Sequence, residues 1–228
     1  MKFFDYYKEE SEVIMERDPA IKNRREVFLY PSFWAVYKYR KAHKLYLQGN
    51  YYRARKISQK AARKTGIEIH PGAQIGKGFF IDHGHGVVIG ETTIIGDNVT
   101  IYQGVTLGGT GKEKGKRHPT LKDGVMVSVG AKVLGNIVIG ENVKIGAGSV
   151  VLSDVPANST VVGIPGRIVR STSVEIPPRK ELDQVHLPDP IRNDIAALQQ
   201  GYDELNRKLE ELLSKEKENR EEVKHENL

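Results

Sequence analysis

An aliphatic side chain recurs at every sixth position through the middle of this chain, with two interruptions. The recurring positions are Ile69, Ile75, Ile81, Ile89, Ile95, Ile101, Leu107, Leu121, Val127, Val133, Ile139, Ile145 and Val151. A period of six fits neither the 3.6-residue turn of an α-helix nor the two-residue alternation of a half-buried strand. It is typical of solenoids in which each hexapeptide supplies a short strand and a tight corner, and in which stacked coils bury the aliphatic row. The sequence therefore predicts a mainly β fold, with a parallel β-helix over residues 67–170.

Two insertions interrupt the repeat without shifting the hexapeptides that follow them. The step from Ile81 to Ile89 spans DHGHGVV, and the step from Leu107 to Leu121 spans GGTGKEKGKRHPT. Insertions of this kind are loops extruded from a solenoid, and such loops often build its binding face. Because both contain histidine, we expect functional residues there. A loop that only aids solubility is the alternative.

Helices are expected on both sides of the repeat. Residues 1–66 carry apolar positions at helical spacing, with Gly49-Asn50 as a turn between two helices and Gly66 as the end of the second. Asp18-Pro19 has the form of a helix N-cap followed by proline at the first helical position.

A linker that contains several prolines is expected at residues 171–190, and a helix at residues 191–228. The apolar positions of this tail follow steps of four and three, which is the heptad pattern of a coiled coil. They are Ile191, Ile195, Leu198, Tyr202, Leu205, Leu209 and Leu212. A lone solvated helix is the alternative.

The net charge of +6 is unevenly spread and bears on the choice of partners. Residues 1–66 contain 16 Lys and Arg against 7 Asp and Glu, whereas residues 171–228 contain 9 against 14. A basic arm can bind nucleic acid, but no nucleic-acid motif accompanies this one, so a solvated helix pair is favoured. No apolar run approaches the ~18 residues that cross a bilayer, and the N-terminus lacks the apolar segment of a signal peptide. We expect a cytoplasmic protein without a nucleic-acid or membrane partner.

The histidines of the two insertions are the candidate catalytic groups. His83 can act as a general base, because the unperturbed pKa of histidine is about 6.5. Glu68 lies fifteen residues earlier, which places it near the same edge and lets it orient His83. His118 at the second insertion can reach over this edge. The alternative for His83 is a histidine with a structural role only, whose ring hydrogen-bonds at a corner of the solenoid.

Metal and thiol chemistry are not expected. The chain has no cysteine, which excludes disulfides, thiolate ligands and a cysteine nucleophile. A zinc site of the kind found in gamma-class carbonic anhydrases needs three imidazoles. No third histidine follows His118 closely.

At these residues the sequence resembles the serine O-acetyltransferases. The matching segments are IEIHPGAQIGKGFFIDHGHGVVIGE, VTIYQGVTLGGTGK, RHP, GAKVLGNIVIGENVKIGAGSVVLSDVP and VVGIPGRIV, which cover residues 67–170 almost without gaps. ERDPA at residues 16–20 extends the resemblance into the helical region. The combination of DHG, GGTGK and RHP separates this family from hexapeptide acetyltransferases that modify sugars or antibiotics.

The resemblance implies a left-handed β-helix that forms homotrimers with active sites between neighbouring copies. It also implies acetyl transfer from acetyl-CoA to L-serine, which yields O-acetyl-L-serine for cysteine biosynthesis. His83 matches the general base of the family, and Glu68 matches the carboxylate behind it. Because a cysteine acyl-enzyme is excluded, direct transfer in a ternary complex is the simpler scheme.

The substrate-binding residues are implied in the same way. Asp18 and Asp82 match the residues that hold the serine ammonium, and Arg117 and His118 match those that face its carboxylate. The residues that match the coenzyme A site are Gly109, Thr110, Val129, Lys144 and Ala147. An acetyltransferase for a sugar or another amino acid is the competing enzyme, and a trimeric scaffold is the non-enzymatic alternative.

The chain departs from the family pattern in three places. Glu68 stands where many members have aspartate, and the N-terminal helical region is shorter than in members that join two trimers into a hexamer. The chain ends in Glu226-Asn227-Leu228, whereas many members end in an isoleucine that docks into O-acetylserine sulfhydrylase. We therefore expect a trimer and no tight complex with the sulfhydrylase.

Overall fold

The computed structural model describes residues 3–111, 114–171, 195 and 198–213. The chain divides into two units, Met1–Pro188 and Asp189–Leu228. No helix in the described ranges is both long and apolar enough to cross a membrane.

The first unit begins with helices. They are α1 (Phe3–Arg17), the 3₁₀-helix η1 (Arg24–Leu29), α2 (Pro31–Leu47) and α3 (Tyr51–Thr65). Proline at the first position of α2 has the fixed φ that a helix start needs. Gly66 follows α3 with a φ of 72°, and its N–H donates a hydrogen bond to the Ala62 carbonyl. The predicted helix end is therefore confirmed. The predicted turn at Gly49-Asn50 lies between α2 and α3 and is confirmed as well.

The prediction of a helix N-cap at Asp18 is wrong. Asp18 follows the last residue of α1, and its N–H donates to the Ile14 carbonyl. Its Oδ1 accepts the N–H of Ala20 at 2.8 Å, which closes a turn across Pro19 instead of starting a helix. The next helical segment has Asn23 as its cap.

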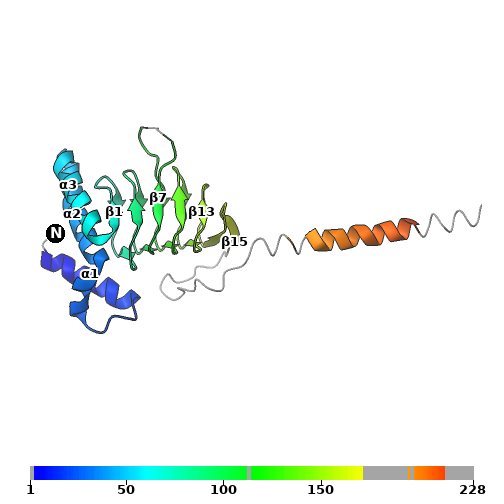
Figure 1. Cartoon of the computed structure of the whole chain (residues 1–228), viewed down its shortest axis with the longest axis horizontal. Coiled ribbons are helices and arrows are strands. Elements are labelled where there is room, and N and C mark those ends of the chain that lie inside the picture. The colour runs from blue at the N-terminus through cyan, green and yellow to red at the C-terminus, as the bar shows by residue number, and fades with distance from the viewer. Residues whose placement is uncertain (1–2, 112–113, 172–194, 196–197, 214–228) are drawn as a thin grey trace, which may run out of the picture. The chain divides into compact units, whose positions relative to one another are not determined.

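A parallel β-helix follows the helices, as the hexapeptide period predicts (Figure 1). Its strands are β1 (Ile67–Ile69), β2 (Gln74–Ile75), β3 (Phe80–Ile81), β4 (Val87–Ile89), β5 (Ile94–Ile95), β6 (Thr100–Ile101), β7 (Thr106–Gly108), β8 (Thr120–Leu121), β9 (Met126–Val127), β10 (Lys132–Leu134), β11 (Val138–Ile139), β12 (Lys144–Ile145), β13 (Val150–Val151), β14 (Ser159–Val162) and β15 (Arg167–Ser171). Up to β13 every third strand joins the same sheet, and β14 and β15 then extend the sheet of β12. The sheets have the orders β1-β4-β7-β10-β13, β2-β5-β8-β11 and β3-β6-β9-β12-β14-β15.

The register shows how the two insertions are accommodated. Glu68 pairs with Val88, Val88 with Thr106, and Thr106 with Lys132, so successive coils are 20, 18 and 26 residues long. The 18-residue coil is three hexapeptides, and the longer coils contain the insertions. Both insertions flank the five-stranded sheet, because the first precedes β4 and the second follows β7, where the chain protrudes from the coils (Figure 1).

The aliphatic row forms the core. All thirteen repeat positions are buried, and none is more than 8% exposed. Burial of such a side chain stabilises a fold by about 1.5–3 kcal/mol. The two ends of the β-helix are covered: α2 and α3 pack on β1, and β15 pairs antiparallel with β14. Tyr39 of α2 and Ser58 of α3 donate hydrogen bonds to the carbonyls of Ala73 and Ile69 in the first coil.

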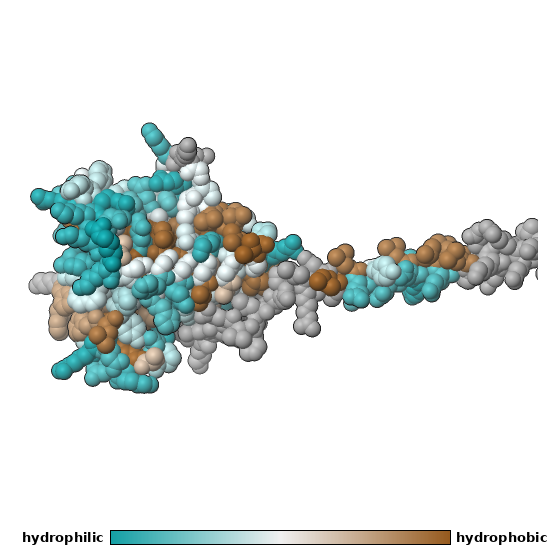
Figure 2. All heavy atoms as spheres, viewed as in Figure 1, coloured by the Kyte–Doolittle hydropathy of each residue, from teal (hydrophilic) through white to brown (hydrophobic). Residues whose placement is uncertain are grey.

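The second unit is a helix over its described residues, 195 and 198–213. The six heptad positions within these residues are all more than half exposed: Ile195, Leu198, Tyr202, Leu205, Leu209 and Leu212. Figure 2 shows hydrophobic residues gathered along one side of this helix. The pairing of this helix into a coiled coil stays a prediction. The predicted linker beyond Ser171 and the tail positions Ile191 and Leu228 lie outside the described residues.

Candidate active site

His83 lies at the corner between β3 and β4 in an unusual backbone conformation. Its φ is 56°, in the left-handed region. The other non-glycine residues with positive φ in the described ranges are Asn98, Asn142 and Asn158, and asparagine tolerates this region far better than most residues. Histidine is also enriched in this region, so the backbone alone does not assign a role to His83. The His83 side chain is also 74% exposed, so its ring is open to a ligand.

Two carboxylates and a tyrosine stand beside His83. Asp82 Oδ1 lies 4.0 Å from His83 Nε2. Burial raises the pKa of Asp82, and the nearby charge of Asp18 raises it further, against the opposing effect of His83. The Tyr30 hydroxyl donates a hydrogen bond to Asp18 Oδ2 at 2.5 Å. Burial, together with this bond, raises the pKa of Tyr30. The corner therefore combines an exposed imidazole with two carboxylates that can hold a cation.

Glu68 has a different partner from the one that the sequence suggested. It lies on β1, and its Oε1 accepts a 3.3 Å hydrogen bond from Gln59 Nε2 of α3. The hydrogen bonds and ion pairs of the described residues do not join Glu68 to His83. In the single chain, Asp82 is the carboxylate nearest to the His83 ring nitrogen in an ion-pair contact.

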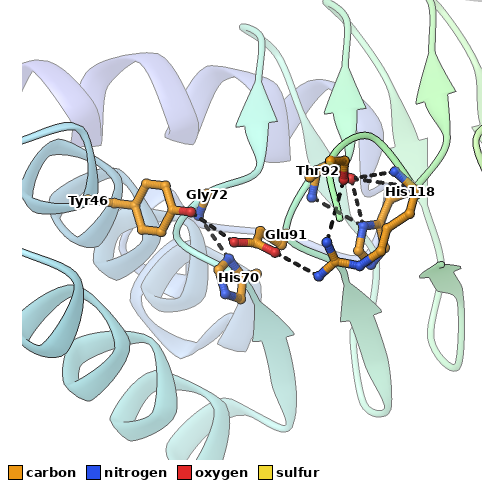
Figure 3. A network of polar contacts seen from close by, with 8 residues as sticks. Tyr46, His70, Gly72, Glu91, Thr92 and His118 are labelled. Carbon is orange, nitrogen blue, oxygen red and sulfur yellow. Dashed lines mark hydrogen bonds and ion pairs between the residues drawn. The ribbon is translucent and has the colours of Figure 1, made fainter. Parts of the chain in front are cut away.

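Arg117 lies in a second polar cluster, drawn in Figure 3. Arg117 Nη2 pairs with Glu91 Oε2 at 2.7 Å, and Tyr46 Oη donates to Glu91 Oε1 at 2.9 Å. The bonds from Arg117 and Tyr46 lower the pKa of Glu91, so this carboxylate is ionised at neutral pH. Behind it, burial and then the charge of Arg55 lower the pKa of His70 to about 4.

His118 is held as a neutral imidazole in the same cluster. Its Nδ1 accepts the backbone N–H of Thr92 at 3.2 Å, and an atom that accepts this bond carries no proton. Burial and then the charge of Arg117 lower the pKa of His118, which favours the same neutral form. The proton of the ring is therefore on Nε2. A Cβ at Gly90 would lie 2.1 Å from Nε2, so only glycine leaves room for the ring there.

Thr92 fixes the loop that carries both residues. Its Oγ1 accepts the backbone N–H groups of Arg117 and His118 at 3.0 and 3.2 Å. Lys116 donates to the carbonyls of Thr92 and His118. These bonds pin the base of an extruded loop to the turn between β4 and β5.

The two clusters lie at different corners of the β-helix. His83 lies between the six-stranded and the five-stranded sheet, whereas Arg117 and His118 lie between the five-stranded and the four-stranded sheet. The hydrogen bonds and ion pairs of the described residues do not link one cluster to the other. One chain therefore presents two separate halves of the predicted serine site.

The corner of His83 continues along the β-helix as a column of glycines. Gly86, Gly104, Gly130 and Gly148 occupy this corner in successive coils, and each has a positive φ. Backbone bonds join the column: the carbonyls of His85, Gln103 and Val129 accept the N–H groups of Gly104, Gly130 and Gly148. A Cβ at Gly130 or Gly148 would meet no atom within 4 Å. A Cβ at Gly86 or Gly104 would lie 3.6 or 3.3 Å from the Cα of the next glycine, so the column starts at the His83 turn and is most open at its later coils.

The residues predicted to bind coenzyme A fall in two places. Val129 and Ala147 are exposed beside the glycine column, and Lys144 lies on the adjacent strand β12. Gly109 and Thr110 lie at the start of the extruded loop, where a Cβ at Gly109 would be 3.3 Å from His118 Nε2. Among the residues that the structure describes, no group of three or more His, Cys, Asp or Glu side chains could hold a metal ion.

Sequence reasoning missed Tyr30, Tyr46, Gln59, Glu91 and Thr92. Tyr30, Tyr46 and Gln59 belong to the helical region, which has no repeat to place them against particular coils. Glu91 and Thr92 fill an ordinary corner of the repeat. The only signal that could have found them is their position directly after Ile89-Gly90, one corner beyond the first insertion.

Comparison with known proteins gives matches along most of the chain. A family model described as bacterial transferase hexapeptide (six repeats) matches residues 118–153. The serine acetyltransferase of Bacillus subtilis strain 168 is 54% identical over 210 residues, which cover 92% of this chain and 96% of the relative.

Two solved structures match the fold closely. The serine acetyltransferase of Neisseria gonorrhoeae in complex with serine has 44% identity and a TM-score of 0.70, over 73% of this chain and 69% of that one. The serine acetyltransferase of Brucella abortus strain S19 in complex with coenzyme A has 43% identity and a TM-score of 0.72, over 76% and 70% of the two chains.

Proposed function

The chain belongs to the serine acetyltransferase family and is an acyltransferase, and we propose that it transfers the acetyl group of acetyl-CoA directly to the hydroxyl of L-serine, with His83 as general base. The observation that carries the assignment of the base is the place of His83 in the first insertion, with a side chain that is 74% exposed and Nε2 at 4.0 Å from Asp82 Oδ1. Its backbone has a left-handed φ, which the other non-glycine residues of the described ranges show only at three asparagines.

The chemistry of the His83 corner fits an amino-acid nucleophile. Asp18 and Asp82 supply negative charge for the ammonium of serine, and Tyr30 fixes the carboxylate of Asp18. His83 takes the proton of the serine hydroxyl while the serine Oγ forms a bond to the carbonyl carbon of the acetyl group. The C–S bond of the thioester then breaks. The proton then passes to the departing thiolate. The relative from Neisseria gonorrhoeae was solved in complex with serine, which supports this choice of acceptor.

The second cluster supplies the complementary charge. Arg117 can pair with the carboxylate of serine, and the Nε2–H of His118 can donate a hydrogen bond to an oxygen beside it. Because the two halves lie at different corners of one chain, the complete site requires two copies. We propose a cyclic homotrimer in which the His83 corner of one copy meets the Arg117 corner of the next.

The glycine column is the proposed path of the acyl donor. It gives an extended ligand close access to the backbone from the His83 turn past Val129 to Ala147. Lys144 on β12 can meet an anionic group of the donor. The relative from Brucella abortus was solved in complex with coenzyme A.

The test of the function is thiol release from acetyl-CoA. The purified chain is assayed with L-serine, D-serine, L-threonine, L-homoserine and a panel of sugars, with the acetylated product identified by mass spectrometry. We expect turnover with L-serine at least tenfold above D-serine and every sugar, because the site pairs opposite charges in a chiral arrangement. Preferred turnover of a sugar, or thiol release that no acceptor stimulates, would overturn the proposal.

A further inference from the structure

Arg117 is oriented by a chain of hydrogen bonds that begins in the N-terminal helices. Tyr46 of α2 donates to Glu91 Oε1 at 2.9 Å, and Arg117 Nη2 donates to Glu91 Oε2 at 2.7 Å (Figure 3). Each carboxylate oxygen thus has its own partner. Glu91 is fixed in rotation as well as in position, and it fixes Arg117 in turn.

The protonation states suit this chain of bonds. Arg117 and Tyr46 lower the pKa of Glu91, whereas burial and the bond to Glu91 raise the pKa of Tyr46. At neutral pH the carboxylate is therefore charged and the phenol is a donor. A bond between ionised and polar groups is stronger than one between neutral groups.

Contacts with His70 and Gly72 hold the Tyr46 ring in place. The His70 ring packs edge-on against it, with centroids 5.8 Å apart, and His70 Nδ1 accepts the N–H of Gly72. A Cβ at Gly72 would lie 3.0 Å from Tyr46 Cζ and 3.1 Å from Glu91 Cγ. A side chain at this position would therefore crowd both the phenol and the carboxylate.

The guanidinium of Arg117 is left partly open. Its side chain is 29% exposed, with Nη2 bonded to Glu91 and Nη1 in a long 3.5 Å bond to the carbonyl of Gly115. The backbone of Arg117 is held separately by Thr92 Oγ1. A guanidinium that is anchored on one side by a carboxylate can offer its remaining N–H groups to a second carboxylate in a fixed direction.

We propose that Tyr46 and Glu91 are positioning residues that aim Arg117 at the substrate carboxylate and so determine selectivity for an amino acid with a free carboxyl group. This inference rests on the proposed function. It gives the helical region a part in specificity, because Tyr46 is the link between α2 and the extruded loop. Neither residue contacts the substrate in this scheme.

The test compares L-serine with L-serinamide, which keeps the hydroxyl and the ammonium but has no carboxylate. In Glu91→Gln we expect KM for L-serine to rise about tenfold or more, as for loss of a charge-assisted bond. In Tyr46→Phe we expect a rise of about threefold to tenfold. KM for acetyl-CoA and kcat/KM for L-serinamide should each change less than twofold, so the preference for serine over serinamide falls.

A double variant tests whether Tyr46 acts through Glu91. In the Glu91→Gln background, adding Tyr46→Phe should raise KM for L-serine less than twofold further, because the bond that Tyr46 makes is to the changed group. Matched controls are Glu141→Gln, in a second Ile-Gly-Glu turn that lies at a different corner of the β-helix, between β11 and β12, and Tyr52→Phe, on the exposed face of α3. Neither control should change the ratio of serine to serinamide.

Three outcomes would overturn the inference. Equal losses with serine and serinamide would show that the pair has only a structural role. A lower KM for L-serine in Glu91→Gln would show that Glu91 competes with the substrate for Arg117. A wild-type enzyme that acetylates neither compound would overturn the proposed function together with the inference. This outcome differs from the first two, in which the wild-type enzyme is active and only the variants change.

Discussion

His83 shows at the scale of one residue how function and stability oppose each other in this fold. His83 lies in the insertion just before Gly86, which is the left-handed residue of this corner, and the other non-glycine residues with positive φ in the described ranges are asparagines. A histidine there costs about 1–3 kcal/mol of backbone strain. The same corner turns the imidazole outward beside Asp82, where a substrate can reach it.

The exchange His83→Asn separates these two effects. Asparagine accepts the left-handed backbone but cannot act as a general base, so kcat should fall by about 10²–10⁴-fold. The midpoint of thermal unfolding should stay the same or rise, because the strain is relieved. The control is His85→Asn, two residues along the same turn, which should retain kcat. A His83→Asn variant with more than half of the wild-type kcat would contradict the role of His83.

At the scale of elements, the helices are docked by polar groups as well as by their apolar faces. Glu10 of α1 is only 8% exposed, and burial raises its pKa to about 8, against the opposing charge of Arg40. Arg40 itself donates to the carbonyls of Ile75 and Gly76, at the end of β2. Helix α1, which precedes Asp18, therefore packs against its neighbours with the Glu10 carboxyl group mostly protonated at neutral pH.

This buried carboxyl group predicts a pH dependence of stability. Between its ordinary pKa of 4.5 and about 8, the folded chain keeps the proton of Glu10 while the unfolded chain releases it. Folded stability therefore decreases as the pH rises through this window. Glu10→Gln removes the ionisation and should stabilise the protein at pH 8 by on the order of 3 kcal/mol, with little effect at pH 4.5.

Urea unfolding at the two pH values measures this difference. The control is Glu12→Gln on the exposed side of α1, where a surface pair with Arg24 should contribute less than about 1 kcal/mol at either pH. An equal effect of Glu10→Gln at both pH values would contradict the protonated state of Glu10.

At the scale of the whole molecule, the two clusters make a prediction about assembly. If the site forms between copies, a chain with His83→Ala and a chain with Arg117→Ala should restore each other when co-expressed. Random assembly of equal amounts gives about one site in four with both halves intact, so about a quarter of the wild-type activity is expected. Each variant alone should be nearly inactive. No recovery in isolated mixed oligomers would place the complete site within one chain.

The tail predicts a second property of the assembly. Its described heptad positions are exposed on the helix itself, which leaves them available to pack against the same helix of other copies. We expect light scattering to give about three times 25.5 kDa for the full chain. A chain ending near Arg170 should dissociate at higher protein concentrations than the full chain. A mass of six copies for both would contradict the trimer, and an equally stable truncated trimer would show that the tail is dispensable.

The sequence by itself determined the β-helix and the place of its insertions. The reason is that a hexapeptide repeat is a local pattern: burial of Ile81, Leu107 or Ile139 follows from its position in the period. The helix end at Gly66 could also be predicted from the sequence, because a left-handed helix cap depends on the presence of a single glycine. The first insertion also pointed to His83 as general base, and family resemblance added the roles of Asp82 and Arg117; all three roles stay predictions.

Only the tertiary structure decided which side chains meet. Asp18 closes a turn and is held by Tyr30, Glu68 bonds to Gln59, and Tyr46 reaches Glu91. These contacts join helices to coils that are distant in the sequence, and they depend on how α1, α2 and α3 dock on the first coil. No repeat or local propensity encodes that docking, because it is the sum of many weak packing and polar contacts.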